Sequence, residues 1–258
     1  MSGDGSGITL RRDGPVAILT LNRPERRNAL DMAAIAGLRD CCAEIEAAEG
    51  LRAVILTGTG RAFCAGGDIA AWSALDAETF GRRWIRDGHD AFDALARLRL
   101  PVIAVLNGHA LGGGLELAAC ADLRIAETHV KLGQPEPGLG IVPGWSGTQR
   151  AVRRFGAQIV RRMVLFGEIF TAEEALAHGL VDLVVETGTG LDAAREVAQA
   201  VIARAPCATT ISKMMINAAE GEERERVLDA LAGTAAAGSA ELAEGLAAFR
   251  EKRKPKFT

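Results

Sequence analysis

The amino-acid sequence predicts an α/β fold with a helical C-terminal part, on three observations over its 258 residues. Short apolar segments typical of buried strands alternate with segments of helical spacing, which is the pattern of strands and helices packed in layers. Glycines gather in loops that follow strands, at 58–67, 108–114 and 138–147. From about residue 150 helical segments predominate. We therefore predict an α/β core over 1–195 and a helical region over 196–258.

The first part of the chain predicts a hairpin followed by a helix. Apolar and polar residues alternate within Ile8–Leu21, and Asp13-Gly14-Pro15 provides a turn between two strands. After a charged loop, apolar residues from Leu30 to Ile45 recur with the spacing of one helix face.

Three further segments are predicted to be strands. Those at 53–57 and 101–106 are apolar, as expected for buried strands, and the third, at 122–126, also contains Asp122 and Arg124. Glycine-rich loops follow the first two runs, and Asp68 and Gly113 stand where the next helices begin. Ligand crevices in open α/β sheets lie at the carboxyl ends of strands, so these loops are the candidate site.

The remainder of the chain predicts helices packed through small residues. One short strand is expected at Val181–Val185, and Thr171 with Glu174 forms a capping-box pattern at a helix start. The helices are predicted at 150–166, 171–178, 191–205, 208–219 and 222–249.

Charge, hydropathy and cysteine usage limit the possible partners. The formal net charge is -3, so no overall basic field attracts nucleic acid, and we expect no nucleic-acid partner. The longest apolar runs are too short to span a bilayer, so we expect no membrane partner. Met1–Gly7 lacks the basic and apolar regions of a signal peptide. Five scattered cysteines without a C-x-x-C pair favour reduced, mostly buried thiols. These features together predict a cytoplasmic protein.

Two glycine-rich loops have the composition of a site that binds a carbonyl oxygen. The first is Arg61–Ile69 and the second is His109–Leu117. In each, small residues let backbone N–H groups approach a ligand, and a helix begins directly afterwards. Two N–H donors at one oxygen form an oxyanion hole, in which losing one donor typically costs about 2.7–4 kcal/mol of transition-state stabilisation.

Two glutamates near these loops are candidate acid/base groups. Glu116 lies in the first turn of the helix after the second loop, where the helix dipole favours a carboxylate. Glu136 lies between Pro135 and Pro137 in a stiff loop. Considered singly, each is better explained as a structural residue, Glu116 as a helix-start glutamate and Glu136 as a surface carboxylate.

Other reaction classes have weaker support. Cys64 lies in the first loop, but no histidine motif accompanies it to activate a nucleophile. Gly108–Gly114 lacks the G-K-[ST] end of a phosphate-binding loop. Gly144–Gly147 resembles half of a nucleophile elbow, but Thr148 stands where G-x-S-x-G requires glycine. The four histidines show no metal-ligand spacing, so we predict no metal.

Taken in order, several segments resemble the enoyl-CoA hydratase/isomerase (crotonase) family. Any single segment is weak, whereas the ordered set is specific and extends from about residue 8 to the C-terminus. The matching segments are Leu21-Asn22-Arg23-Pro24 with Asn28-Ala29-Leu30, Ala62–Ile69 (AFCAGGDI), Pro101–Gly108 (PVIAVLNG), Ala110–Ala118 (ALGGGLELA), Gly133–Glu136 (GQPE) and Pro143–Arg150 (PGWSGTQR).

The resemblance implies a fold, an assembly and a substrate class. The implied fold is a spiral core of repeated ββα units followed by a C-terminal helical trimerisation region. The implied assembly is a homotrimer or a homohexamer made of two trimers. The implied substrate is an acyl-CoA thioester. Coenzyme A is then part of the substrate, and no separate cofactor is expected.

The resemblance also implies roles for individual residues. Gly67 and Gly113 match the two backbone N–H donors that hold the thioester oxygen. Glu116 matches the carboxylate that activates water, and Glu136 matches the proton donor to the α-carbon. Gly144 matches a loop glycine whose N–H helps to position the water. The path of the CoA adenine and pantetheine is matched by Arg26, Arg27, Ala29, Ala65, Gly66, Gly67, Asp68 and Ile69.

Hydration of 2-enoyl-CoA to 3-hydroxyacyl-CoA, with its reverse, is the activity that the complete glutamate pair favours. Attack at the β-carbon places charge on the thioester oxygen, which two N–H donors stabilise. Two close carboxylates should titrate as a coupled unit. Two alternatives stay open, namely isomerisation of 3-enoyl-CoA to 2-enoyl-CoA and a non-catalytic acyl-CoA-binding or RNA-binding relative.

One departure from the family pattern bears on the acyl group. Trp145 and Ser146 occupy a stretch where the family more commonly has small residues. A tryptophan here either reshapes the acyl pocket or only packs the loop.

Overall fold

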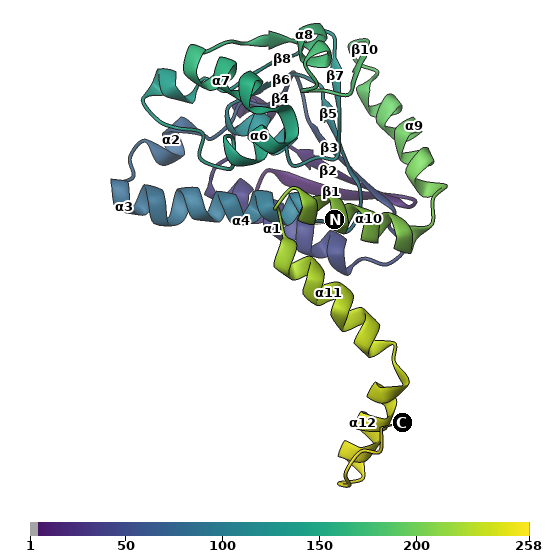
Figure 1. Ribbon diagram of the computed structural model, residues 1–258. Coiled ribbons are helices and arrows are strands. Elements are labelled where there is room, and N and C mark those ends of the chain that lie inside the picture. Colours follow the sequence, from purple (N-terminus) through teal and green to yellow (C-terminus); the bar gives the residue numbers. More distant parts are fainter. Residues whose placement is uncertain (1–4, 258) are drawn as a thin grey trace. The chain divides into compact units, whose positions relative to one another are not determined.

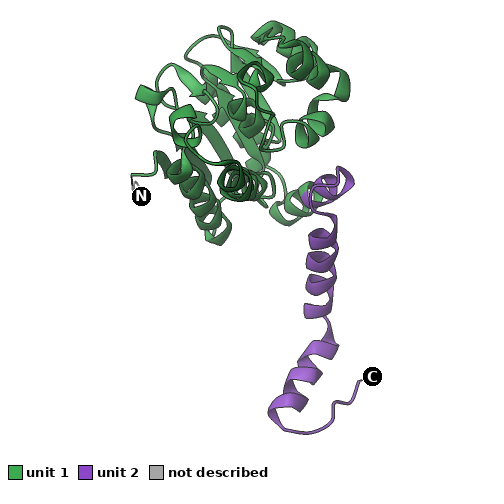
Figure 2. Cartoon of the chain, turned by 90° about the vertical axis from the view of Figure 1, so that its left-hand side faces the viewer, with its two compact units in different colours: residues 1–213 green, residues 214–258 purple. Residues whose placement is uncertain are grey.

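The computed structural model describes residues 5–257 and confirms the α/β class (Figure 1). The chain divides into two compact units, Met1–Lys213 and Met214–Thr258 (Figure 2). Both sheets belong to the first unit, and the second unit is helical. The first four residues of the Met1–Gly7 segment lie outside the described residues. Within the described residues, no helix combines the length and apolar character needed to cross a bilayer.

The larger sheet has six strands in the order β1-β2-β3-β5-β7-β10. β1 runs antiparallel to β2, confirming the predicted hairpin, and every other neighbouring pair is parallel. The interior strands β3 and β5 are buried on both faces, which explains their continuous apolar sequences. The strands are β1 (Ile8–Asp13), β2 (Val16–Leu21), β3 (Ala53–Gly58), β5 (Val102–Leu106), β7 (Leu123–Glu127) and β10 (Leu183–Val185).

The smaller sheet consists of four strands of two or three residues, in the order β4-β6-β8-β9. β4, β6 and β8 are parallel neighbours, and β9 runs antiparallel to β8. The sequence did not predict these strands, because three residues are too few to show a period. The strands are β4 (Ala62–Cys64), β6 (His109–Leu111), β8 (Lys131–Gly133) and β9 (Phe170–Thr171).

A repeated unit links the two sheets. Each of the pairs β3–β4, β5–β6 and β7–β8 places its first strand in the larger sheet and its second strand in the smaller sheet. A helix follows each pair: α2 (Ile69–Trp72), α5 (Gly113–Ala118) and the 3-10 turn η3 (Glu136–Leu139). The three chain segments that follow β4, β6 and β8 therefore emerge at one edge of the smaller sheet.

The helices that cover the sheets follow local capping signals. Asp31 caps α1 (Met32–Ala47) by accepting a hydrogen bond from the Ala34 N–H, so this helix begins two residues after the start of the predicted stripe. α1 packs against α4 (Arg86–Ala96). α3 (Ala77–Thr79) and the π-helical segment η2 (Phe80–Ile85) precede α4 and were not predicted. On the other face of the larger sheet, α9 (Gly190–Ile202) packs against alternate strand residues such as Ile55 and Ile103.

Two predictions of long helices are wrong. Residues 150–166 form α6 (Gln149–Phe155) and α7 (Ala157–Phe166), because Gly156 between them has a φ of +89° that ends the first helix. Residues 222–249 form α11 (Arg224–Ala237) and α12 (Ala240–Arg250), with Ser239 capping the second. The capping box of Thr171 and Glu174 is confirmed at α8 (Ala172–Ala177). α10 spans Pro206–Ala219.

Candidate active site

A single cavity of about 100 Å³ lies where the loops after β4, β6 and β8 meet. Parallel strands bring these loops to the same edge of the smaller sheet, as expected for an α/β ligand site. The cavity is lined by all five residues to which the sequence assigned a catalytic role: Gly67, Gly113, Glu116, Glu136 and Gly144.

The first loop presents the Gly67 N–H. Gly66 has a φ of +94°, a left-handed conformation that favours glycine. Leu30 holds the loop, because its N–H donates to the Gly66 carbonyl at 2.8 Å and its carbonyl accepts the Asp68 N–H at 2.7 Å. The Gly67 N–H between these contacts has no hydrogen-bond partner among residues 5–257. It is therefore available to a ligand in the cavity.

The second loop presents the Gly113 N–H. Gly112 has a φ of 53° and a ψ of -126°, a combination that essentially only glycine adopts. Gly113 begins α5, so its N–H is one of the donors that the first turn of a helix leaves unpaired. The two loops touch, since a Cβ placed on Gly113 would lie 3.3 Å from the Gly66 Cα. The two candidate donors therefore lie on adjoining loops of one cavity.

Glu116 is held in the first turn of α5 by two backbone donors. Its Oε1 accepts the N–H of Trp145 at 2.7 Å and the N–H of Gly147 at 2.6 Å. Ser146 between these donors has a φ of 73°, which turns both N–H groups toward one oxygen. The sequence did not reveal these two donors, because the left-handed conformation falls on a serine rather than a glycine.

The electrostatics of Glu116 favour retention of a proton. The side chain is 3% exposed. Burial, and after it the charge of Glu136, raises the pKa of Glu116 to about 8. The N–H groups of Trp145 and Gly147, together with Arg150, act in the opposite direction.

Glu136 has no comparable support. It opens η3, is 7% exposed, and neither carboxyl oxygen has a hydrogen-bond partner in the described part of the chain. A Cβ placed on Gly112 would lie 2.9 Å from Glu136 Oε1, so the carboxyl group rests directly on that glycine. Burial raises the pKa of Glu136 to about 7.

A buried amide accompanies the two glutamates. The Gln134 side chain is fully buried, and neither its oxygen nor its nitrogen has a partner among the residues described. A side chain at Gly147 would collide with the Gln134 amide nitrogen and would lie 2.5 Å from Glu116 Oε1. Gln134 is therefore a polar neighbour of Glu116 for which the sequence predicted no role.

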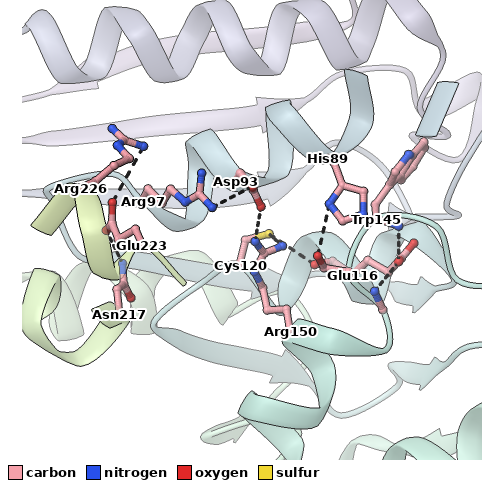
Figure 3. A network of polar contacts seen from close by, with 12 residues as sticks. His89, Asp93, Arg97, Glu116, Cys120, Trp145, Arg150, Asn217, Glu223 and Arg226 are labelled. Carbon is pink, nitrogen blue, oxygen red and sulfur yellow. Dashed lines mark hydrogen bonds and ion pairs between the residues drawn. The ribbon is translucent and has the colours of Figure 1, made fainter. Parts of the chain in front are cut away.

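A charged network lies behind Glu116 (Figure 3). Arg150 is 1% exposed and forms an ion pair with Asp93 at 2.6 Å. Its Nη1 also donates to Cys120 Sγ at 3.5 Å, and Asp93 pairs in turn with Arg97 at 3.0 Å. The positive charge of Arg150 lowers the pKa of Glu116, so this network favours an ionised Glu116.

The residues predicted to bind CoA fall into two groups. Ala65, Gly66, Gly67 and Ile69 line the cavity. Arg26, Arg27, Ala29 and Asp68 do not line it.

Three of the residues outside the cavity lie on the 22–29 loop, which is hydrogen-bonded to the first glycine-rich loop, and the fourth, Asp68, lies at the end of that glycine-rich loop. Arg26 and Arg27 are exposed, and the Ala65 N–H donates to the Arg27 carbonyl at 3.1 Å. Asn28, which the sequence did not single out, fixes this loop by donating to the Thr59 and Ala62 carbonyls. Asp68 has a local role as the cap of α2, and it forms an ion pair with Arg23 at 3.6 Å.

The alternative nucleophiles are poorly placed. The Cys64 thiol is buried, and burial raises its pKa to about 12, so it stays a neutral thiol at physiological pH. Ser146 does not line the cavity, and its hydroxyl lies 3.4 Å from His89 Nδ1. Neither residue competes with the glutamate pair as the reactive group.

The chain is similar to known proteins of one family. The family described as "Enoyl-CoA hydratase/isomerase" matches residues 11–258. The chain is 40% identical over 213 residues to the short-chain-enoyl-CoA hydratase of Clostridium acetobutylicum, covering 82% of this chain and 81% of that protein. It is 35% identical to the crotonyl-CoA hydratase of Syntrophomonas wolfei, covering 97% of each chain.

Solved structures resemble the chain over nearly its whole length. Pseudomonas aeruginosa DspI has a TM-score of 0.80 at 34% identity, covering 98% of this chain and 97% of that chain. The enoyl-CoA hydratase of Bacillus anthracis has a TM-score of 0.79 at 31% identity, covering 97% of this chain and 98% of that chain.

Proposed function

The chain belongs to the enoyl-CoA hydratase/isomerase family, and we propose that it hydrates 2-enoyl-CoA thioesters to 3-hydroxyacyl-CoA, and catalyses the reverse dehydration, with Glu116 and Glu136 as its acid/base pair. One observation carries this proposal: two buried carboxyl groups share a cavity with the backbone N–H groups of Gly67 and Gly113, which have no hydrogen-bond partner among residues 5–257. The hydratases among its relatives support the same reaction.

The thioester carbonyl oxygen binds between the N–H groups of Gly67 and Gly113. Addition of water at the β-carbon moves negative charge onto this oxygen, and fixed donors stabilise that charge without reorganisation. Both N–H groups belong to loops fixed by neighbouring backbone, through Leu30 on one side and through the Gly112 N–H to the Gly133 carbonyl, at 2.9 Å, on the other. The donors are therefore in place before the substrate binds.

Glu116 removes a proton from the attacking water. Its Oε1 is occupied by the two N–H donors, whereas Oε2 accepts no hydrogen bond from residues 5–257 and is the oxygen that accepts one from water. Gly144 lines the cavity one residue before Trp145, so its N–H is a candidate second contact for that water. The hydroxyl group then adds to the β-carbon while Glu116 gains the proton.

Glu136 delivers a proton to the α-carbon. The pair carries one proton throughout: Glu136 gives its proton away, Glu116 gains one from water, and transfer between them restores the starting state. The order of the pKa values, about 8 for Glu116 and about 7 for Glu136, would place the shared proton on Glu116 instead.

We assign the shared proton to Glu136 for two reasons. The charge of Glu136 is one cause of the raised pKa of Glu116, and this cause disappears once Glu136 holds the proton. In addition, the N–H groups of Trp145 and Gly147 donate to Glu116, whereas in the described part of the chain the only hydrogen-bonding influence that lowers the pKa of Glu136 is its own backbone N–H.

The surroundings of the site support three further assignments. Arg26 and Arg27 are exposed residues on a segment whose Arg27 carbonyl accepts the Ala65 N–H, and guanidinium groups suit the phosphates of coenzyme A. A homotrimer, or a hexamer of two trimers, is the assembly that family membership supports, and the mass of the protein in solution tests it. The five free cysteines support a cytoplasmic location.

Product analysis tests the proposed reaction. Purified protein is incubated separately with the four-carbon 2-enoyl-CoA and with its 3-enoyl isomer. Hydration predicts that 3-hydroxybutyryl-CoA accumulates from the 2-enoyl substrate. Formation of the 2-enoyl isomer from the 3-enoyl substrate, with no hydroxyacyl product from either, would identify an isomerase. No turnover of either thioester would support the non-catalytic alternative.

A further inference from the structure

All three tryptophans of the chain line the same small cavity. They are Trp72, Trp84 and Trp145, in a sequence that is only 4% aromatic. They converge on the loop that carries one thioester donor, since a Cβ placed on Gly67 would lie 2.8 Å from Trp84 Cζ2, 3.4 Å from Trp145 Cη2 and 3.5 Å from Trp72 Cδ1. Three indole rings therefore lie close to the Gly67 donor.

Trp145 occupies a slot that three glycines leave open. A Cβ placed on Gly113 would lie 2.8 Å from its Cζ3, and a Cβ placed on Gly88 would collide with the pyrrole edge of the indole. The benzo edge of the indole therefore rests on both glycines that carry the donors, Gly67 and Gly113, and the opposite edge rests on α4.

The indole is held in this slot by its neighbours. Its Nε1 donates to the Trp84 carbonyl at 3.2 Å. The ring packs against Trp84 and Phe92, each with a centroid separation of 5.1 Å. Only 3% of Trp145 is exposed. A side chain fixed by a hydrogen bond and by two aromatic neighbours forms a rigid wall, which a ligand does not displace easily.

We propose that the Trp145 indole limits the substrate to short acyl groups of about four carbons. The proposed site for the carbonyl oxygen is between Gly67 and Gly113, and the indole edge rests on both, so the acyl chain, which begins at the carbonyl carbon, would start next to that edge. The cavity of about 100 Å³ is smaller than an engineered cavity of about 150 Å³ that holds the six carbons of benzene. This inference rests on the proposed hydratase function and adds the substrate class.

Trp145 contributes to the site in two separable ways. Its backbone N–H anchors Glu116, and its indole shapes the acyl end of the cavity. Any substitution other than proline keeps the N–H, so side-chain variants change the cavity without removing a donor from Glu116. The informative quantity is therefore the ratio of activities on long and short substrates.

The test measures kcat/KM for straight-chain 2-enoyl-CoA thioesters of four, six, eight and ten carbons. In the wild type, kcat/KM should fall at least about tenfold from four to six carbons, since a pocket that refuses one methylene discriminates by roughly 10–200-fold. In Trp145→Ala, the eight-carbon to four-carbon ratio should rise at least about tenfold. Trp145→Leu should raise this ratio by a smaller factor. It provides the same test if the alanine variant does not fold.

Phe155→Leu is the matched control, because Phe155 is a buried aromatic residue outside the cavity. Its chain-length ratio should equal that of the wild type. Binding of butyryl-CoA and octanoyl-CoA, followed by tryptophan emission, gives a readout without turnover. The chain has no tyrosine, so all such emission comes from the cavity wall.

Two results would overturn the inference while leaving the hydratase proposal intact. One is a wild-type protein that hydrates eight- and ten-carbon substrates as well as the four-carbon substrate. The other is a Trp145→Ala protein with the wild-type ratio. Failure of the wild type to hydrate any of the four substrates would instead overturn the proposed function.

Discussion

The two glutamates of the site lie in contrasting surroundings. Glu116 projects from a helix, and one of its oxygens accepts two backbone N–H groups from the 145–147 segment. Glu136 opens a 3-10 turn between two prolines, and its carboxyl oxygens have no hydrogen-bond partner in the described part of the chain. Both are buried in the wall of one cavity.

This contrast supports the proposal that two identical side chains take two different roles. Hydrogen bonds to a carboxylate stabilise its charged form, whereas burial without partners favours the neutral acid. Glu116 is thus suited to accept a proton from water in a fixed position. Glu136 is suited to hold a proton and release it to carbon.

Glu116→Gln and Glu136→Gln should each abolish most hydration. An amide can neither accept the water proton nor donate a carboxyl proton, and general acid–base groups contribute about 10²–10⁴-fold to rate. Steady-state hydration of the four-carbon 2-enoyl-CoA measures both losses. Turnover near that of the wild type in either variant would remove that residue from the proposed mechanism.

Gly147→Ala should disturb only the Glu116 side of the contrast. The added Cβ would lie 2.5 Å from Glu116 Oε1 and would collide with the Gln134 amide. We expect kcat/KM to fall by about 10–100-fold, which corresponds to roughly 1.4–2.7 kcal/mol of lost transition-state stabilisation. Gly81→Ala is the matched control, because a Cβ there meets nothing within 4 Å. Equal activity in the two variants would show that the position of Glu116 is not critical.

Glu136→Gln should stabilise the fold at high pH. Burial raises the pKa of Glu136 from 4.5 to about 7 in the folded chain. Folding therefore favours the neutral acid. The resulting contribution of Glu136 to the free energy of unfolding is fully present below pH 4.5 and is lost as the pH rises through 7. Relative to the wild type, Glu136→Gln should gain about 1–3 kcal/mol of unfolding free energy between pH 5 and pH 9. Denaturant unfolding of both proteins at pH 5 and at pH 9 measures this gain. If the difference in unfolding free energy between the variant and the wild type is the same at the two pH values, Glu136 is not desolvated in the folded chain.

Ser146→Gly should have the smallest effect. Ser146 has a φ of 73°, where glycine is not strained. The substitution should keep both N–H donors to Glu116 and stabilise the chain by up to about 1 kcal/mol, with hydration activity within about twofold of the wild type. Thermal unfolding measures the change in stability, and a hydration assay measures the change in activity. A large loss of activity would show that the serine hydroxyl, 3.4 Å from His89, matters to the site.

The sequence predicted the frame of the molecule better than the contacts of its site. The strands β3 and β5 are continuous apolar runs, and their burial on both faces is visible in composition alone. The short strands β4, β6 and β8 show no pattern, yet they bring the candidate loops to one edge. Gly156 interrupts a helical pattern that composition alone could not divide, because the break depends on its backbone angle.

The prediction of the two glutamates as site residues also needed more than the local sequence around each. Each is unremarkable alone, and their order along the chain with the glycine-rich loops is what identified them. The donors from Trp145 and Gly147 depend on the left-handed Ser146, for which a serine gives no warning. The unpartnered amide of Gln134 was equally hidden, because only its surroundings distinguish it from any other glutamine. The alternative that Trp145 only packs the loop is wrong, because the indole packs against Phe92 and also lines the cavity; its effect on the acyl group stays a prediction.

Exchange of the α-protons of butyryl-CoA with D₂O, followed by NMR, tests the division of roles most directly. This saturated thioester cannot be hydrated, so exchange needs only the group that faces the α-carbon and the two N–H donors. We predict that Glu136→Gln lowers the exchange rate by at least about 100-fold, whereas Glu116→Gln lowers it by less than about tenfold. The reverse order, or equal loss in both variants, would contradict the assignment of Glu136 as the α-carbon acid and Glu116 as the base for water.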